Sequence, residues 1–311
     1  MSKILITGAA GYIGSMLCTK LLESGHTVTA VDTIKYDKNS LSHLFYFDNF
    51  KFLKEDVTKL KVIKKIIKKQ DFIIPLAALV GAPLCEKFKK NTLKTNVKAI
   101  ETLLKYKKKS QKIIYPTTNS GYGIGDKGKF CDESSPLNPI SLYGVTKVKA
   151  EELIMQNGNC ICFRLATVFG YSYRMRTDLL VNNFVERAVK TKKLEIFEPN
   201  FRRNYIHIKD IVDAFVFAID NFEKLKNNIY NLGLSSANIT KIQLARKIKK
   251  YIKGLQIKVI KNRKDPDKRD YFVSNKKIEK HGFKAKVSLD TGIKELIKIF
   301  NYCDIKFKNN Y

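Results

Sequence analysis

The sequence has no tryptophan, only four methionines and seven prolines among its 311 residues, and no long continuous apolar stretch. A membrane-spanning helix needs about 20 consecutive apolar residues, so the sequence argues against one. The N-terminus opens on a strand-like run, without a basic or apolar leader. We therefore expect a soluble, cytoplasmic protein with no membrane partner.

Acidic residues are also scarce, since 29 Asp and Glu stand against 59 Lys and Arg, for a formal net charge of +30. Such a charge attracts nucleic acids and anionic membranes without specificity. The lysines are spread along the chain, and the abundance of Lys, Ile, Asn, Phe and Tyr is typical of AT-rich coding sequences. We interpret the charge as a solvated surface that helps to attract an anionic substrate, and we expect no specific nucleic-acid partner.

Cysteine pairs with metal-ligand spacing are absent as well. The six cysteines are scattered at positions 18, 85, 131, 160, 162 and 303. Cys160 and Cys162 belong to an apolar run, in which alternate residues share one face of a strand. Buried, reduced thiols are therefore favoured over zinc ligands, and we predict no metal site.

The sequence does contain a regular alternation of short apolar runs and amphipathic segments up to about residue 165. The runs have the length and β-branching of buried strands, and they cover residues 3–7, 27–31, 50–54, 72–76, 112–115 and 160–163. Strands that alternate with helices form parallel sheets with right-handed crossovers. This pattern predicts the α/β class, with a Rossmann-type doubly wound parallel sheet. Beyond it we expect a helix over 210–219 and then a mixture of helices and short strands from about residue 231.

A glycine-rich turn follows the first predicted strand directly. The run Gly8-Ala-Ala-Gly11-Tyr12-Ile13-Gly14 leads into a segment with apolar residues at helical spacing. Glycine turns often serve structure alone. Between a strand and a helix, however, this turn places backbone amides and a helix N-terminus where they can receive a pyrophosphate.

An acidic residue, Asp32, ends the second predicted strand, 18 residues after Gly14. A carboxylate near this separation binds the adenosine ribose of a dinucleotide and repels a 2′-phosphate. The sequence therefore favours NAD over NADP as the cofactor. Asp56 and Val57, after the third predicted strand, could contact adenine, although an acid at this place is more often a turn residue.

Tyr143 and Lys147 are one helical turn apart and so share one face of a helix. A phenol has a pKa of about 10 and needs a nearby positive charge to act as a base at neutral pH. Lys147 and an oxidised nicotinamide could both supply that charge. The pair is a candidate for moving a proton and a hydride together, although single Tyr-x-x-x-Lys pairs also arise by chance.

Together these motifs resemble the extended short-chain dehydrogenase/reductase family, whose members act on nucleotide-diphosphate sugars, and the resemblance covers nearly the whole chain. Its cofactor turn matches residues 7–14, and Leu76, Ala77 and Ala78 match the strand end that passes under the cofactor. Asn96 matches a helix asparagine that tends to be structural. Residues 117–123, 143–147 and 203–210 match the Ser/Thr segment, the catalytic pair and a later substrate signature.

By this resemblance Thr118 bonds the reacting sugar oxygen, Tyr143 accepts its proton, and Lys147 holds the phenolate and the cofactor ribose. Asn119 and Ser120 occupy substrate-binding positions where the family's 4,6-dehydratases have an Asp-Glu pair, and where enzymes that epimerise beside the keto group have a cysteine second. An amide and an unactivated hydroxyl are poor acids or bases. We therefore expect redox chemistry at one carbon only.

The resemblance also assigns the substrate side of the site. Arg203 and Arg269 match positions whose guanidinium groups grip the substrate diphosphate, and Asn182 lies in a segment that contributes an amide to the phosphate or base. Residues 174–176, Arg-Met-Arg, resemble a substrate loop, while Thr167 replaces an asparagine found in many relatives. His207 is interpreted as a histidine satisfied by backbone contacts rather than an acid or base.

The expected organisation is an NAD-binding Rossmann domain over residues 1–165 plus about 205–230, and a smaller mixed C-terminal lobe for the nucleotide sugar over about 166–204 plus 231–311. Three functions stay open. The first is an NAD-dependent dehydrogenase that oxidises a nucleotide sugar at C4, with a GDP-heptose as candidate substrate, in bacterial polysaccharide biosynthesis. The second is a nucleotide-sugar 4-epimerase, and the third a noncatalytic NAD-binding protein, against which the complete Thr-Tyr-Lys set argues. The resemblance also implies a homo-oligomer, a dimer or tetramer.

Overall fold

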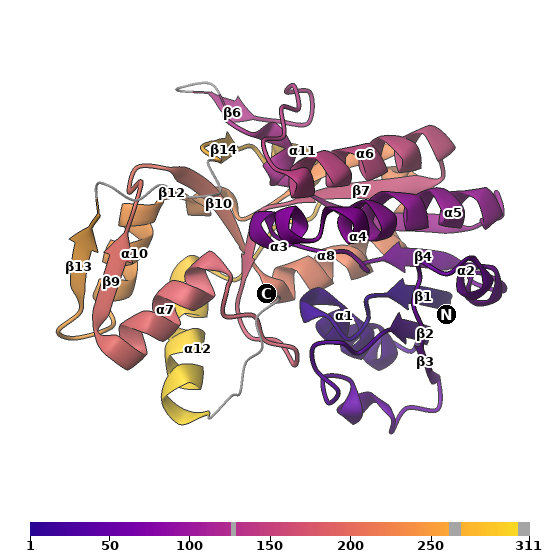
Figure 1. Ribbon diagram of the computed structural model, residues 1–311, viewed down its shortest axis with the longest axis horizontal. Helices are drawn as coiled ribbons and strands as arrows, with labels where there is room; N and C mark the ends of the chain where they lie inside the picture. The colour runs from indigo at the N-terminus through magenta and orange to yellow at the C-terminus, as the bar shows by residue number, and fades with distance from the viewer. Residues whose placement is uncertain (126–128, 261–268, 304–311) are drawn as a thin grey trace.

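A seven-stranded parallel sheet forms the centre of the computed structural model, which describes residues 1–125, 129–260 and 269–303 (Figure 1). The strand order is β11-β7-β5-β4-β1-β2-β3, and every neighbouring pair is parallel. The strands are β1 (Lys3–Thr7), β2 (Thr27–Asp32), β3 (Phe50–Lys54), β4 (Phe72–Pro75), β5 (Lys112–Thr118), β7 (Cys160–Leu165) and β11 (Asn228–Leu232). Six of them coincide with the predicted apolar runs, which confirms the predicted fold class.

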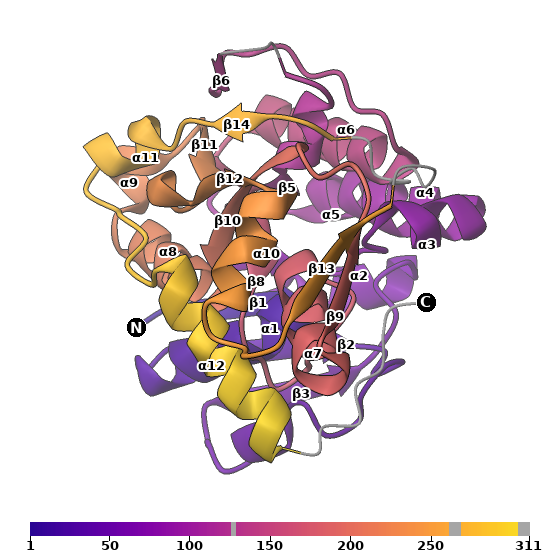
Figure 2. The same ribbon diagram turned by 90° about the vertical axis from the view of Figure 1, so that its left-hand side faces the viewer.

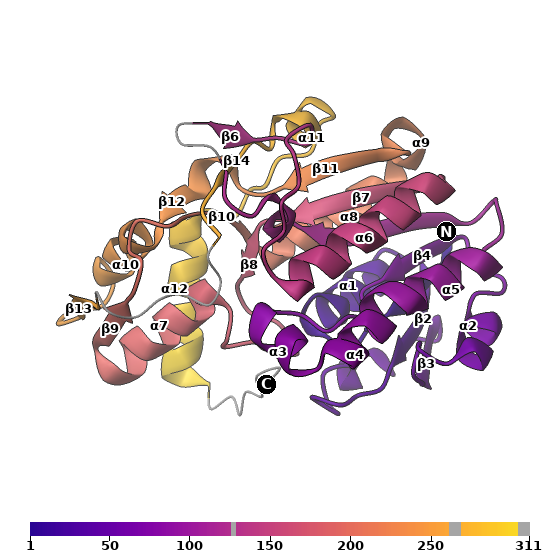
Figure 3. The ribbon, with the colours of Figure 1, turned by 45° about the horizontal axis from the view of Figure 1, so that its top comes forward.

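Helices cover both faces of this sheet, because alternate residues of the buried strands point to opposite faces. In β1, Ile4 and Ile6 pack into a core with α1 (Tyr12–Glu23) and α8 (Ile208–Asp220), while Leu5 packs into a second core on the other face. The second core is covered by α2 (Leu60–Ile66), α5 (Ala99–Tyr106) and α6 (Leu142–Asn157). The two layers are visible in Figure 3.

The C-terminal lobe is built around a third apolar core. Its helices are α7 (Leu180–Thr191), α10 (Lys241–Lys249) and α12 (Leu289–Tyr302), which lie in front in Figure 2. Its sheets are small: β8 (Thr167–Phe169), β10 (Arg202–His207) and β12 (Asn238–Thr240) form one, and β9 (Lys193–Ile196) and β13 (Gln256–Val259) form another. A third pairs β6 (Phe130–Cys131) with β14 (Phe272–Val273).

Short helices complete the described part of the chain. They are η1 (Ser42–Leu44), α3 (Ala82–Lys87), α4 (Lys89–Leu93), the π-helical turn η2 (Lys94–Lys98), η3 (Asn119–Tyr122), α9 (Phe222–Leu225), η4 (Ser235–Ala237) and α11 (Lys276–Lys280). None of the helices within the described ranges combines the length and the apolar character needed to cross a membrane.

The segment around residue 207 differs in detail from the expectation. The helix predicted over 210–219 begins two residues earlier, and its N-cap is His207, whose Nδ1 accepts a hydrogen bond from the Lys209 amide. Asp210 instead accepts hydrogen bonds from the amides of Lys286 and Val287 and so joins α8 to the loop before α12. Strand β10, which precedes α8, belongs to the small sheet and not to the large one.

Candidate active site

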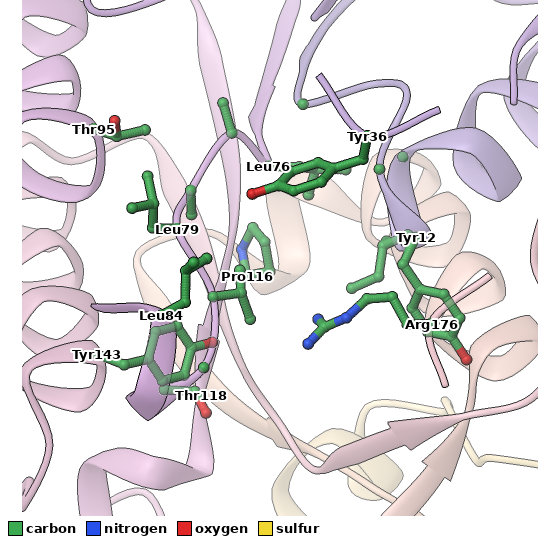
Figure 4. A pocket seen from close by; sticks show the side chains of 18 of the residues that line it. Tyr12, Tyr36, Leu76, Leu79, Leu84, Thr95, Pro116, Thr118, Tyr143 and Arg176 are labelled. Carbon is green, nitrogen blue, oxygen red and sulfur yellow. The ribbon is translucent and has the colours of Figure 1, made fainter. Parts of the chain in front are cut away.

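A cavity of about 730 Å³ lies at the carboxyl ends of the parallel strands, where the large sheet faces the lobe. The ends of β1 to β5 meet here because the strands are parallel, and ligands of open α/β sheets bind at this edge. The lobe contributes the segment between β8 and α7, together with Arg203 and Arg269. Figure 4 shows Thr118 and Tyr143 on one side of the cavity, with Tyr36, Tyr12 and Arg176 on the other.

The glycine turn is shaped by close backbone packing. Gly8 has a φ of +71°, and a Cβ atom there would lie 2.6 Å from the amide nitrogen of Ala77. A Cβ atom on Gly14 would lie 2.4 Å from the carbonyl oxygen of Gly8. Gly11 is the N-cap of α1 and offers no side chain as a cap. The turn therefore presents backbone and a helix N-terminus to the cavity, as an anionic phosphate requires.

The predicted cofactor-binding residues all line this cavity. They are Gly8, Gly11, Tyr12, Ile13, Gly14, Asp32, Asp56, Val57, Leu76, Ala77, Ala78, Tyr143 and Lys147. Asp32 is held by two amides, since Oδ2 accepts from Ala10 at 3.1 Å and Oδ1 from Ile34 at 2.7 Å. Burial raises the pKa of Asp32 against the effect of these bonds. Asp56 also fulfils the turn role considered for it, because its Oδ1 accepts from the Thr58 amide at 2.8 Å.

Thr118, Ser120 and Arg269 form a hydrogen-bonded chain beside Tyr143. The Thr118 Oγ1 lies 2.9 Å from the Ser120 Oγ and accepts from the Ser120 amide at 3.1 Å. Arg269 donates from Nη1 to the Ser120 Oγ. Tyr143 lies beside Thr118 at the cavity (Figure 4), so the two residues proposed to contact a sugar oxygen are neighbours.

The charges around Tyr143 and Lys147 differ from what the sequence predicted. Burial raises the pKa of Tyr143 to about 12, and the cations that oppose this most are Arg269 and Arg176 rather than Lys147. Lys147 is itself only 4% exposed, with Nζ 4.0 Å from the Tyr115 ring centroid, and burial lowers its pKa to about 7. Lys147 therefore supplies less charge to the phenol than we expected, because it is desolvated too.

Two networks of buried hydrogen bonds hold the elements that carry these residues. The Tyr122 hydroxyl donates to Asn231 at 2.7 Å and accepts from Arg164, which is paired with Glu151 of α6 at 2.7 Å. Asn96 bonds both the amide and the carbonyl of Leu79, and its Nδ2 also donates to the Thr146 hydroxyl. The predicted structural asparagine thus connects the loop after β4 to the helix that carries Tyr143 and Lys147.

The predicted substrate-binding residues fall into two groups. Thr118, Ser120, Arg203 and Arg269 line the cavity. Asn119 and Asn182 do not, and both are buried. The Asn182 amide is engaged in the lobe, where Oδ1 accepts from Gly170 and Nδ2 donates to the Arg176 carbonyl. Its neighbour Asn183 lines the cavity, so the substrate role of Asn182 stays a prediction for which Asn183 is the better placed candidate.

Many residues that line the cavity were absent from the predicted site, Arg174, Arg176 and Tyr36 among them. Arg174 and Arg176 both line the cavity and are buried, and the centroid of the Tyr36 ring lies 4.7 Å from the Arg174 guanidinium carbon. Arg176 forms a two-pronged contact with Asp178. The Arg-Met-Arg run was the one available signal, but the sequence does not show that this loop folds back over the end of β2.

His207 lies outside the cavity lining. Its Nε2 is 2.7 Å from Oε2 of Glu295 in α12, and its Nδ1 caps α8. The histidine is thus satisfied by a carboxylate as well as by backbone. This placement agrees with a structural interpretation and gives it no contact with the reacting groups.

The comparisons with known proteins agree with this architecture. Residues 4–233 match the model of the NAD dependent epimerase/dehydratase family. The chain belongs to that family, whose description carries the NAD dependence predicted from the glycine turn and Asp32.

Individual relatives are diverse. The chain is 29% identical to dTDP-D-glucose 4,6-dehydratase of Dictyostelium discoideum, over 80% of this chain and 62% of that protein. It is also 29% identical to UDP-glucuronic acid decarboxylase 3 of Arabidopsis thaliana, over 94% and 86%. A crystal structure of UDP-glucose 4-epimerase from Thermotoga maritima aligns with a TM-score of 0.84 at 26% identity, over 96% and 98%. The chain spans less than two thirds of several curated relatives, the Dictyostelium protein among them.

Proposed function

We propose that this chain is an NAD-dependent enzyme that oxidises one hydroxyl of a nucleotide-diphosphate sugar, at C4, and releases a keto sugar. The observation that carries the proposal is the placement of Thr118 beside Tyr143 (Figure 4) in a cavity that Lys147 and the glycine turn also line. Known relatives that act on such sugars support the substrate class. The Rossmann part would bind the cofactor and the lobe the nucleotide.

In the proposed reaction, Thr118 orients the sugar hydroxyl and Tyr143 accepts its proton. Bound NAD supplies the hydride acceptor, so the carbon loses a hydride, a C=O bond forms, and the products are a keto sugar, NADH and a proton. Because burial holds the pKa of Tyr143 near 12, the base form needs further positive charge beside the phenol. The positive charge of an oxidised nicotinamide bound beside Tyr143 would meet that need.

Asn119 and Ser120 limit the reaction to redox at one carbon. Ser120 is engaged with Thr118 and Arg269, and Asn119 carries an amide that does not titrate near neutral pH. Neither can drive the loss of water. From the resemblance of residues 119–120 and 168–176 to enzymes of bacterial capsule sugar modification, we propose a GDP-heptose as the first candidate substrate and bacterial polysaccharide biosynthesis as the first candidate pathway. From the same resemblance we propose a cytoplasmic homo-oligomer.

The alternative function is a 4-epimerase, in which the keto intermediate rotates and takes the hydride back on its other face. The fold similarity to the Thermotoga epimerase favours it. Incubation with a panel of GDP-, UDP- and dTDP-sugars and excess NAD separates the two. Stoichiometric NADH accumulation supports the dehydrogenase, and conversion of the sugar without net NADH supports the epimerase. If no sugar of the panel is converted and no NADH forms, both functions are contradicted.

A further inference from the structure

Arg174 lies at the junction of the lobe and the large sheet. It belongs to the segment between β8 and α7, is only 2% exposed, and lines the cavity. Its guanidinium carbon lies 4.7 Å from the centroid of the Tyr36 ring, which follows β2 and its terminal Asp32. A side chain of the lobe thus reaches the end of the cavity where Asp32 is predicted to bind the adenosine ribose.

The charge of Arg174 is not matched by hydrogen-bond acceptors. Its Nη2 is buried and has no hydrogen-bond partner among the residues that the structure describes. Arg176, two residues later, is paired with Asp178 at hydrogen-bond distance, whereas no carboxylate of the described residues lies within ion-pair distance of Arg174. Burial and the neighbouring Arg176 lower the pKa of Arg174 against the attraction of Asp178 and Asp37.

A buried cation that has an aromatic neighbour but no hydrogen-bond acceptor or carboxylate partner is costly, so an anion at this end of the cavity would compensate its charge. The planar guanidinium group suits two-pronged bonding to phosphate. The glycine turn offers phosphate-binding amides to the same cavity. The segment of Arg174 is joined to this turn, because the Ser172 Oγ accepts from the Arg174 amide and donates to the Tyr12 carbonyl.

We propose that Arg174, from the lobe, binds the pyrophosphate of NAD together with the glycine turn. The cofactor is then bound by both the large sheet and the lobe. Its release requires the segment between β8 and α7 to break its contact with the pyrophosphate. The inference concerns the cofactor and does not depend on which sugar is oxidised.

The same chemistry could serve the pyrophosphate of the nucleotide sugar, and ligand titrations separate the two sources. Arg174→Met removes the charge and keeps much of the volume, and Arg187→Met, at a surface arginine of α7 that is 42% exposed, is the matched control. Calorimetric titrations of cofactor-stripped protein with ADP-ribose, GDP and UDP give the dissociation constants. We expect Arg174→Met to raise the constant for ADP-ribose at least about tenfold, with GDP and UDP unchanged and Arg187→Met like wild type.

If Arg174→Met loses affinity only for GDP or UDP, or if its ADP-ribose dissociation constant is unchanged, Arg174 does not bind the NAD pyrophosphate. Thermal unfolding supplies an independent readout. Without cofactor, Arg174→Met should have a Tm no lower than that of wild type, because it loses a buried charge without a carboxylate partner. NADH should raise the Tm of this variant by less than it raises the Tm of wild type. A lower Tm without cofactor would mean that Arg174 is structural and would also overturn the proposal. Should that variant not fold, Arg174→Lys must show weaker ADP-ribose binding than wild type.

Discussion

At the scale of single residues, the proposed reacting groups are the hydroxyls of Thr118 and Tyr143 and the buried amine of Lys147. In the proposed reaction Tyr143 accepts the proton, and Thr118 bonds the sugar oxygen. A lost general base typically costs roughly 10²- to 10⁴-fold in turnover. Tyr143→Phe keeps the ring and should lose turnover in that range, while Thr118→Val should lose less.

Both variants should still bind cofactor, which titration with NADH fluorescence checks. Turnover is measured as NADH formation with the best nucleotide sugar of the panel. If the phenylalanine variant transfers hydride at a rate near that of wild type, Tyr143 is not the base.

Lys147 should make stability depend on pH in a defined direction. Its pKa is about 7 in the folded protein, against 10.5 for an exposed lysine. Between these values the unfolded chain binds the extra proton, so the contribution of Lys147 to the free energy of unfolding rises with pH across this window. Below about pH 7 the full cost of burying the charge is present.

Lys147→Met removes this cost. In cofactor-free protein the variant should be more stable than wild type near pH 7, by a few kcal/mol at most, and the advantage should shrink toward about pH 10. Urea unfolding of both proteins across this range measures the difference. An advantage that is constant with pH, or that grows, would show that Lys147 is not desolvated as described.

At the scale of elements, the catalytic helix α6 is held in register by a polar side chain of its neighbour. Asn96 satisfies the amide and carbonyl of Leu79 and also reaches Thr146. Asn96→Ala leaves these groups without partners in a buried site, at about 1–3 kcal/mol for each unsatisfied group. We expect a lower free energy of unfolding and a lower turnover.

The exposed Asn157 at the end of α6 provides the control. Asn157→Ala should leave stability and turnover close to wild type in the same denaturation and rate measurements. Equal behaviour of the two alanine variants would remove the bridging role assigned to Asn96.

Much of the large sheet could be predicted because its signals are local. Residues 4–6 form an unbroken apolar run, and Gly14 after it is enforced by the nearby backbone of Gly8 and Ala9. Gly8 itself packs against the backbone of Leu76 and Ala77, which follow β4. Such local patterns do not show which residues far apart in the sequence lie close together in the fold. The positions of Arg174 and Asn183 depend on how the lobe folds back over β2, and Asp210 is used by a loop more than 70 residues away.

The charges around Tyr143 and the desolvation of Lys147 could not be predicted from the sequence either. The spacing of Tyr143 and Lys147 placed both on one helix face and in one cavity. It could not show that Lys147 would be as desolvated as the phenol, or that Arg176 and Arg269 would approach Tyr143 from the lobe.

At the scale of the whole molecule, the sheet and the lobe bring different ligands together. Arg203 and Arg269 line the cavity from the lobe and are proposed to bind the substrate diphosphate. A charge-assisted hydrogen bond contributes roughly 1.5 to 3 kcal/mol, so Arg203→Met and Arg269→Met should each raise the GDP or UDP dissociation constant at least about tenfold. ADP-ribose binding should change far less.

Arg187→Met again serves as the control, and calorimetry with each nucleotide provides the constants. Unchanged nucleotide affinity in both variants would place the substrate diphosphate elsewhere in the cavity.

The most direct test of the central claim is the mass of the product formed by the wild-type protein. With excess NAD and an accepted nucleotide sugar, mass spectrometry and NMR should find a C4 keto sugar lighter by two hydrogens, with one NADH formed for each. A C4 epimer of unchanged mass would select the alternative function. A product lighter than the substrate by one water would contradict the account, because Asn119 and Ser120 cannot drive dehydration.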